Sequence, residues 1–308
     1  MKTLVLGGTG WVGHHIVRYY HDAGHEVVAG SRGKKKDFAG EMPDGIESVT
    51  VDKSGETEMA ELLENRFEII IDTVPTEKSI DFVHKYAKGL RRYIHCSSTG
   101  GYAPLKVVPA DETHPYGAAF GSGWKNKQIV DEKVMRLFAE KGFPATVIRP
   151  CYITGQGMVP IDNLGGRRRD FIQDIIHGAE IELPNDGRSL LQPIEVTELA
   201  RSFLLCAGTD VSIGQTYNIC LEKSVTLTRY IEITAAALEK RVSIVYLPLV
   251  ELLEKYKGKI NETGLRFLAE HMCFDISKAR NQIGYEPRFS TEQAIENTAR
   301  WAAAIQAK

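Results

Sequence analysis

A glycine-rich turn near the N-terminus has the spacing of a phosphate-binding loop. Residues 7–13 read GGTGWVG, so Gly7, Gly10 and Gly13 recur at three-residue intervals. In such a turn the first glycine permits a positive φ, the second lets the backbone approach a pyrophosphate, and the third lets a helix pack closely on a strand. The N-terminus of that helix offers unpaired N–H groups and a partial positive charge to phosphates. The turn therefore predicts a dinucleotide-binding site; the alternative is a purely structural glycine turn.

The segments around this turn are the elements that such a site requires. Residues 2–6 are short and apolar like a buried parallel strand, residues 14–23 carry apolar side chains at helical spacing, and residues 26–30 indicate a second strand. The alternation continues, with strands expected at 46–51, 69–71, 93–96 and 145–148 and helices at 58–64, 79–88 and 127–141. Alternating strands and helices are typical of the α/β class, and we predict a doubly wound parallel sheet.

The composition of the chain and the order of its expected elements change after residue 150. Residues 155–166 are rich in Gly and Pro, as in a binding loop, and mixed elements follow, including a strand-like segment at 216–219. These changes predict two parts: a cofactor domain over 1–155, to which 188–210 returns, and a smaller C-terminal lobe formed mostly by 156–308.

The end of the second strand bears on which dinucleotide is bound. An NAD enzyme usually has a carboxylate there to accept a hydrogen bond from the ribose 2′-hydroxyl. This chain instead has Gly30, Ser31 and Arg32, followed by lysines at 34–36. Arg32 could pair with a 2′-phosphate and Ser31 could donate to it. We therefore expect NADP, with NAD possible; the alternative is a solvated basic loop.

Composition excludes several other classes of protein. The 308 residues are 43% hydrophobic and 25% charged with a formal charge of −2, which fits neither a disordered chain nor a protein with a global field for nucleic acid. No apolar run approaches the ~18 residues of a membrane span. Five cysteines lie far apart without a Cys-x-x-Cys pair, so we expect no metal site and buried free thiols in a reducing cytoplasm.

With these features the chain resembles the NAD-dependent epimerase/dehydratase family, the extended branch of the short-chain dehydrogenases/reductases. Residues 93–99, YIHCSST, look like the family's strand ending in the catalytic Ser/Thr. Residues 148–150, IRP, are similar to the segment whose backbone flanks the nicotinamide, and residues 284–287, GYEP, resemble the C-terminal signature. The turn, the second strand and the resemblance together give these expected cofactor contacts: Gly7, Thr9, Gly10, Trp11, Val12, Gly13, Ser31, Arg32, Asp52, Thr73, Val74, Pro150 and Tyr152.

The chain departs from the family where the proton chemistry should be. The family pattern is Tyr-x-x-x-Lys at the start of the long helix, where the lysine and the oxidised nicotinamide lower the pKa of the phenol. One alignment places Trp124 and Gln128 at these positions, and an alignment shifted by one places Gly123 and Lys127 there. The tyrosine nearest upstream, Tyr116, has no lysine four residues later. No alignment supplies the pair.

Two interpretations of this departure stay open. Either Ser98 acts with a displaced acid such as Tyr116 or Tyr102, with Lys127 or Lys125 nearby, or the site holds a nucleotide without redox chemistry. The resemblance implies hydride transfer on a sugar nucleotide or similar polar metabolite, and it suggests Tyr102 and Arg167 as substrate contacts; for the arginines at 167–169 the alternative is an exposed basic helix start. Arg188, in a hairpin-like turn, is a further candidate substrate contact. The alternative is a nucleotide-holding regulator or an RNA-binding protein like the chloroplast stem-loop proteins, although the charge balance makes nucleic acid an unlikely partner. The apolar face of residues 128–138 suggests a homodimer, and the chain is expected in the cytoplasm, not in a membrane.

Overall fold

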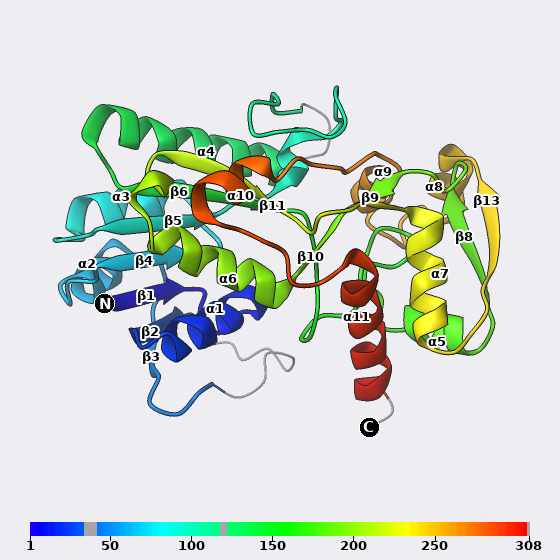
Figure 1. Ribbon diagram of the computed structural model, residues 1–308, viewed down its shortest axis with the longest axis horizontal. Coiled ribbons are helices and arrows are strands. Elements are labelled where there is room, and N and C mark those ends of the chain that lie inside the picture. The colour runs from blue at the N-terminus through cyan, green and yellow to red at the C-terminus, as the bar shows by residue number, and fades with distance from the viewer. Residues whose placement is uncertain (34–41, 118–121, 307–308) are drawn as a thin grey trace.

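A parallel sheet of seven strands forms the centre of the computed structural model, which describes residues 1–33, 42–117 and 122–306. The strand order is β11-β6-β5-β4-β1-β2-β3 (Figure 1). This arrangement confirms the predicted doubly wound α/β fold. The strands are β1 (Lys2–Leu6), β2 (Glu26–Ser31), β3 (Glu47–Thr50), β4 (Ile69–Asp72), β5 (Arg92–Cys96), β6 (Ala145–Pro150) and β11 (Gln215–Ile219).

Helices cover both faces of the sheet, which explains why its central strands are almost wholly apolar and buried. On one face, α1 (Trp11–Asp22) and α6 (Val196–Ala207) share a core with Val5, Ile71 and Ile148. On the other face, α2 (Glu56–Leu63), α3 (Glu77–Tyr86) and α4 (Ser122–Lys141) pack on Leu4 and Ile70. Alternate residues of one strand therefore point into two separate cores.

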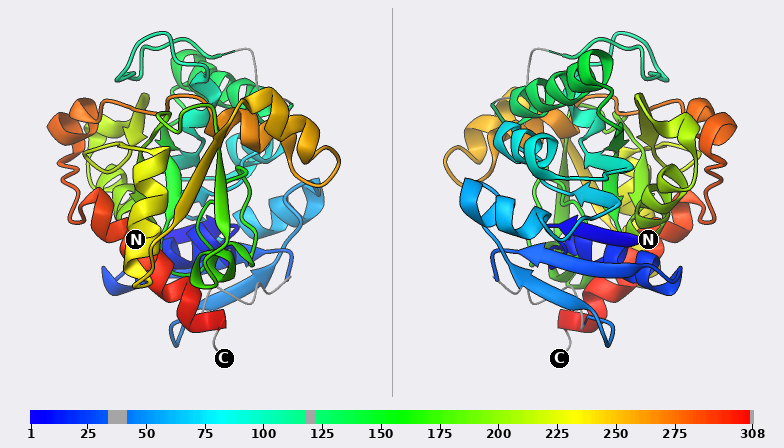
Figure 2. Two further views of the ribbon diagram at one scale, coloured as in Figure 1. Left: turned by 90° about the vertical axis from the view of Figure 1, so that its right-hand side faces the viewer. Right: turned by 90° about the vertical axis from the view of Figure 1, so that its left-hand side faces the viewer.

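A smaller lobe stands at the carboxyl end of the strands, on the right of Figure 1 and toward the viewer in the left view of Figure 2. Its core is built mainly from α5 (Phe171–Ile176), α7 (Leu227–Ala237) and α11 (Thr291–Gln306), and β8 (Glu180–Pro184) pairs with β13 (Ser243–Leu247) in parallel. Elements after β6, apart from α6 and β11, are β7 (Tyr152–Thr154), α5 (Phe171–Ile176), β8 (Glu180–Pro184), β9 (Leu190–Leu191), β10 (Pro193–Glu195), β12 (Val225–Thr226), α7 (Leu227–Ala237), β13 (Ser243–Leu247), α8 (Leu249–Lys255), α9 (Glu262–Leu268), α10 (Ser277–Ile283) and α11 (Thr291–Gln306).

Two later segments return to the sheet. Helix α6, which lies within the returning stretch 188–210, packs on α1, and the Tyr20 hydroxyl donates to the carbonyl of Phe203 at 2.8 Å. Residues 216–219 were expected in the lobe, and this expectation is wrong. They belong to β11, which pairs with β6 as the edge strand of the sheet.

The expectation of five free thiols is also wrong, because Cys151 and Cys220 form a disulfide. Ile219 pairs with Pro150 in the register of β11 and β6, so the two cysteines follow directly on neighbouring strands. Their Cα atoms lie 5.5 Å apart across 69 residues of sequence. Strand pairing over that separation has no local sequence signal. Cys96, Cys206 and Cys273 are free.

Thiol counting tests this pairing directly. The unfolded but unreduced protein is expected to react with a thiol reagent at three cysteines, and at all five after reduction. Five reactive thiols without reduction would contradict the disulfide.

Candidate cofactor and substrate site

The first turn has the geometry of a diphosphate cradle. Gly7 has φ +84°, and a Cβ placed on it would lie 2.2 Å from Thr73 Oγ1. A Cβ on Gly13 would lie only 2.1 Å from the Gly7 carbonyl oxygen. Helix α1 begins at Trp11 with Gly10 as its N-cap, without a capping side chain or an acidic residue in its first turn. The leading N–H groups of α1 are therefore left for a bound anion, as the diphosphate of a dinucleotide requires.

The end of β2 carries the groups expected to read the adenosine ribose. Arg32 is exposed, and half-buried Ser31 accepts from the N–H of Gly33 at 3.2 Å through Oγ. Asp52 is exposed on the neighbouring strand end. Hydrogen bonds from the backbone and side chain of Ser54, together with the charge of Arg32, lower the pKa of Asp52. The lysines at 34–36 lie outside the described residues.

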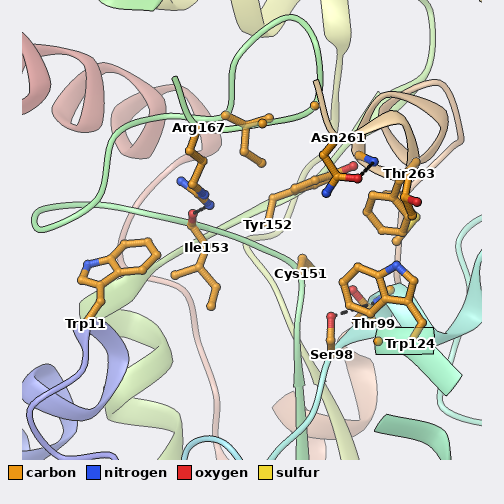
Figure 3. A pocket seen from close by; sticks show the side chains of 18 residues that line it. Trp11, Ser98, Thr99, Trp124, Cys151, Tyr152, Ile153, Arg167, Asn261 and Thr263 are labelled. Carbon is orange, nitrogen blue, oxygen red and sulfur yellow. Dashed lines mark hydrogen bonds between the residues drawn. The ribbon is translucent and has the colours of Figure 1, made fainter. Parts of the chain in front are cut away.

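A cavity of about 740 Å³ lies between Trp11 of the first turn, the segment after β5 and the lobe. Figure 3 shows Trp11 from the first turn on one side, Ser98 below, and Tyr152 and Arg167 above. Trp124 closes another side, where its ring stacks on Phe267 of α9 with centroids 5.3 Å apart. The cavity walls thus come from the segments that follow β5 and β6, from α4 and from the lobe.

Ser98 follows β5 and faces this cavity. It is the N-cap of a short 3₁₀ helix at Thr99–Tyr102, and its Oγ accepts from the N–H of Gly100 at 3.1 Å. The hydroxyl hydrogen remains available to a ligand, because this contact uses the oxygen only as an acceptor. Ser98 can therefore donate to a carbonyl or hydroxyl oxygen of a substrate.

Tyr116 and Tyr102, two of the residues expected at the site, belong instead to a buried polar cluster behind it. The Tyr116 hydroxyl donates to Asp131 Oδ2 at 2.7 Å, and the guanidinium of Arg149 donates to both phenols. The two rings stack with centroids 6.1 Å apart, and the guanidinium carbon of Arg149 lies 4.9 and 4.6 Å from them. Burial raises the pKa of Tyr102 to about 12 and also raises that of Tyr116. Neither lines the described cavity, so their placement gives no support to an acid–base or substrate role.

Asp131 is the centre of this cluster. Its Oδ2 also accepts from Ser97 Oγ at 2.8 Å and from Arg149 Nε at 3.0 Å, and His95 Nε2 lies 2.8 Å from Oδ1. Burial raises the pKa of Asp131, but the hydrogen bond and charge of His95 and the charge of Arg149 outweigh it. The net pKa is far below the usual range. The cluster ties α4 to β5 and β6 directly under Ser98.

Comparison with known proteins assigns the fold and the first turn to one family. The model of the NAD dependent epimerase/dehydratase family matches residues 3–81 and 76–220. The chain belongs to this family.

Individual relatives are distant but span nearly the whole chain. The chloroplast stem-loop binding protein of 41 kDa b of Arabidopsis thaliana is 24% identical over 96% of this chain and 78% of its own length. A 3-beta-hydroxysteroid dehydrogenase of Mycolicibacterium neoaurum is 25% identical over 96% of this chain and 89% of its own length.

Solved structures share the fold. A UDP-glucose 4-epimerase of Thermotoga maritima with UDP-glucose has a TM-score of 0.79, with 19% identity over 99% of this chain and 100% of that one. An epimerase of Methanothermobacter thermautotrophicus has a TM-score of 0.80, with 17% identity over 99% and 93%.

The structure favours one of the two alignments of the epimerase/dehydratase family's Tyr-x-x-x-Lys pattern. Lys127 turns toward the sheet and donates to the Ser97 carbonyl at 3.5 Å. Gln128 instead donates along the helix to Glu132 at 2.7 Å. This orientation favours the alignment that places Gly123 and Lys127 at the two positions of the family pattern, and the role of Lys127 stays a prediction.

The remaining predicted contacts fall into two groups. Tyr152 and Arg167 line the cavity, and Arg167 donates to the carbonyls of Val159 and Ile153, both at 2.6 Å. Burial lowers the pKa of Arg167 and raises that of Tyr152. Arg188 is exposed in a turn beside Asp186 and does not line this cavity.

The other expected cofactor contacts lie around the first turn and at strand ends. Thr73 Oγ1 donates to the Leu6 carbonyl at 3.0 Å beside Gly7, Val74 is exposed, and Pro150 ends β6. Asn261, Thr263 and Phe267 in the cavity wall were missed, because nothing in the sequence places the 261–267 segment against the sheet.

Two absences hold for the described ranges 1–33, 42–117 and 122–306. Among these residues we find no group of three His, Cys, Asp or Glu side chains that could hold a metal ion. The same residues include no helix long and apolar enough to cross a membrane.

Proposed function

We propose that the protein is an NAD(P)-dependent enzyme that transfers a hydride to or from a carbonyl or alcohol carbon of a polar metabolite such as a sugar nucleotide. The observation that carries this proposal is a cavity whose wall includes Trp11 of the first turn, Ser98 and residues of the lobe. Support comes from the solved neighbours, one of which is a UDP-glucose 4-epimerase with UDP-glucose. The family description names NAD.

The residues around the cavity would have separate roles in this reaction. A bound nicotinamide cofactor supplies or accepts the hydride. The first turn holds its diphosphate, and Ser98 orients the reacting oxygen of the substrate by a hydrogen bond. Arg167, half-buried beside Trp11, presents its remaining N–H groups to an anionic part of a ligand. Trp124 and Phe267 exclude water from one side of the cavity.

The preference for NADP gives a direct binding test. Arg32→Ala is expected to weaken NADPH binding about 10- to 100-fold, because a charge-assisted hydrogen bond contributes roughly 1.5–3 kcal/mol, and to leave NADH binding unchanged. Quenching of tryptophan fluorescence can report both affinities, since Trp11 and Trp124 line the cavity.

Arg91→Ala is the matched control, because Arg91 is an exposed arginine just before β5. It lies at the amino end of the parallel strands, whereas Arg32 follows the carboxyl end of β2. Equal loss of NADPH and NADH affinity in Arg32→Ala would remove the role given to Arg32. Failure of the unaltered protein to bind either cofactor would overturn the proposed function itself. Turnover of UDP-glucose and related sugar nucleotides, followed by product analysis, tests the substrate class.

The rival function is RNA binding, which the name of the Arabidopsis relative suggests. It would use the basic stretch at 167–169. Arg167 is committed to two carbonyls at the cavity, and Arg168 bonds Asn163 and Asp174 at 3.1 and 3.2 Å. These engagements favour the enzyme. A cytoplasmic location and a homodimer through α4 stay predictions from the sequence.

A further inference from the structure

The place of the missing phenol is an open gap. Gly123 lies one helical turn before Lys127 on α4, and a Cβ built on Gly123 meets nothing within 4 Å. The residues just before it in sequence, 117–122, are Gly, Ala, Ala, Phe, Gly and Ser, so none supplies a phenol, imidazole, amine or carboxylate. The indole of Trp124, the next residue along the helix, lies against Gly100 in the same cavity.

Gly123 lies in the walls of two separate cavities. Gly123 and Ser98 both line the cavity of about 740 Å³ (the main cavity). Gly123 also lines a second cavity of about 430 Å³ between α3, β5 and α4. Lys127 lines that second cavity together with His95, Asn126 and Glu77. Lys127 is half-buried and Asn126 is exposed, so water can reach the amine from this side.

The other phenols are poorly placed to replace the missing one. Tyr102 and Tyr116 are held by Arg149 and Asp131, outside the main cavity. Tyr152 lines the cavity, but its hydroxyl points toward Asn261 and away from Ser98 (Figure 3). A hydride transfer nevertheless requires a proton partner for the substrate oxygen.

We propose that Lys127 itself exchanges this proton, through a water molecule that fills the gap over Gly123. This inference rests on the proposed function. In reduction, the carbonyl carbon accepts the hydride, the π-electron pair moves to oxygen, and the bridging water gives that oxygen a proton while taking one from the Lys127 ammonium. The neutral amine regains a proton from solvent through the second cavity. Oxidation runs through the same steps in reverse.

Proton release on cofactor binding tests this proposal without a substrate. An oxidised nicotinamide held beside Ser98 would add a positive charge near the Lys127 ammonium, so binding of NADP⁺ is expected to release a fraction of a proton. The release should vanish in Lys127→Met, persist in Lys125→Met on the exposed face, and be absent with NADPH. Measurement at about pH 9 keeps the 2′-phosphate fully ionised, since its second pKa is near 6.

Other titratable groups also face Lys127. Glu77 and His95 line its cavity, and the charge of Lys127 acts on the Cys96 thiol, whose pKa burial raises to about 11. Unchanged proton release in Lys127→Met, with unchanged NADP⁺ affinity, would assign the proton to one of these groups and overturn the proposal while leaving the proposed function intact. No binding of either cofactor would be a failure of the proposed function.

A variant that introduces a phenol at residue 123 provides the second test. The phenol introduced by Gly123→Tyr should face Lys127 and titrate, in the ultraviolet difference spectrum against the unaltered protein, roughly one to three pH units below an ordinary phenol. Adding Lys127→Met should return it to the ordinary range. Titration that is normal and insensitive to Lys127→Met would show that the amine does not face the gap, and the proposal would fail.

Discussion

Gly13→Ala is expected to destabilise the protein by about 1–3 kcal/mol, typical of overpacking, and to remove measurable dinucleotide binding. Alanine normally stabilises the interior of a helix relative to glycine. Here the added Cβ would lie 2.1 Å from the Gly7 carbonyl oxygen and 2.9 Å from Gly8 Cα. Both obstacles are backbone atoms, so relief requires the diphosphate cradle to open. Urea unfolding and cofactor titration measure the two effects.

Gly123→Ala is the matched control because it makes the same chemical change in a helix with nothing nearby. It should leave the protein as stable as before or more stable by about 0.5–1 kcal/mol. If the two variants have the same free energy of unfolding, close packing of α1 on β1 is not the reason for Gly13.

Asp131→Ala is expected to cost about 3–5 kcal/mol of unfolding free energy, because it leaves the Arg149 guanidinium buried without its carboxylate. Asp131 is 1% exposed and Arg149 6% exposed, so water cannot replace the lost partner. Asp131→Leu combined with Arg149→Met should cost clearly less than the two single variants together, since no charge then remains buried. Strict additivity would show that the two side chains do not act as a pair.

The same carboxylate should make the protein sensitive to acid. The folded-state pKa of Asp131 lies below its unfolded value of 3.8. The group therefore contributes stability that is present above pH 3.8 and is lost as the pH falls toward its folded-state pKa. Unfolding followed from pH 7 downward should show less loss in Asp131→Asn than in the unaltered protein. An identical pH profile in both would contradict this role.

The cofactor half of the fold could be predicted because its signals are local. Each buried strand is a short apolar run between glycine or charged residues. The spacing of the glycines in the first turn indicates the backbone conformation of that turn. The start of α4 could not be predicted as well: it begins at Ser122 and not near 127, because Gly121 and Gly123 argue against a helix there. Helices α8 to α10 are seven residues each and depend on packing, which no periodicity reveals over that length.

The site divides in the same way. Ser98 and Lys127 follow from motifs that occupy single elements, and the structure places both at the sheet edge. Asp131 reads in sequence as one more charge on a polar helix, and only the tertiary fold brings it to Arg149 and His95. Tyr116 was chosen for its chemistry and its nearness in sequence. Neither property could show that its hydroxyl is bonded to Asp131.

The stacked rings of Trp124 and Phe267 connect the two halves of the molecule, one ring rising from α4 and the other descending from α9. Trp124 also lies flat on Gly100, where a Cβ would approach within 2.7 Å of the indole. A ligand that moves the indole of Trp124 must therefore also displace the lobe or the loop after Ser98. Entry of a ligand that moves the indole and displacement of the lobe or loop are then coupled, because both move the same ring.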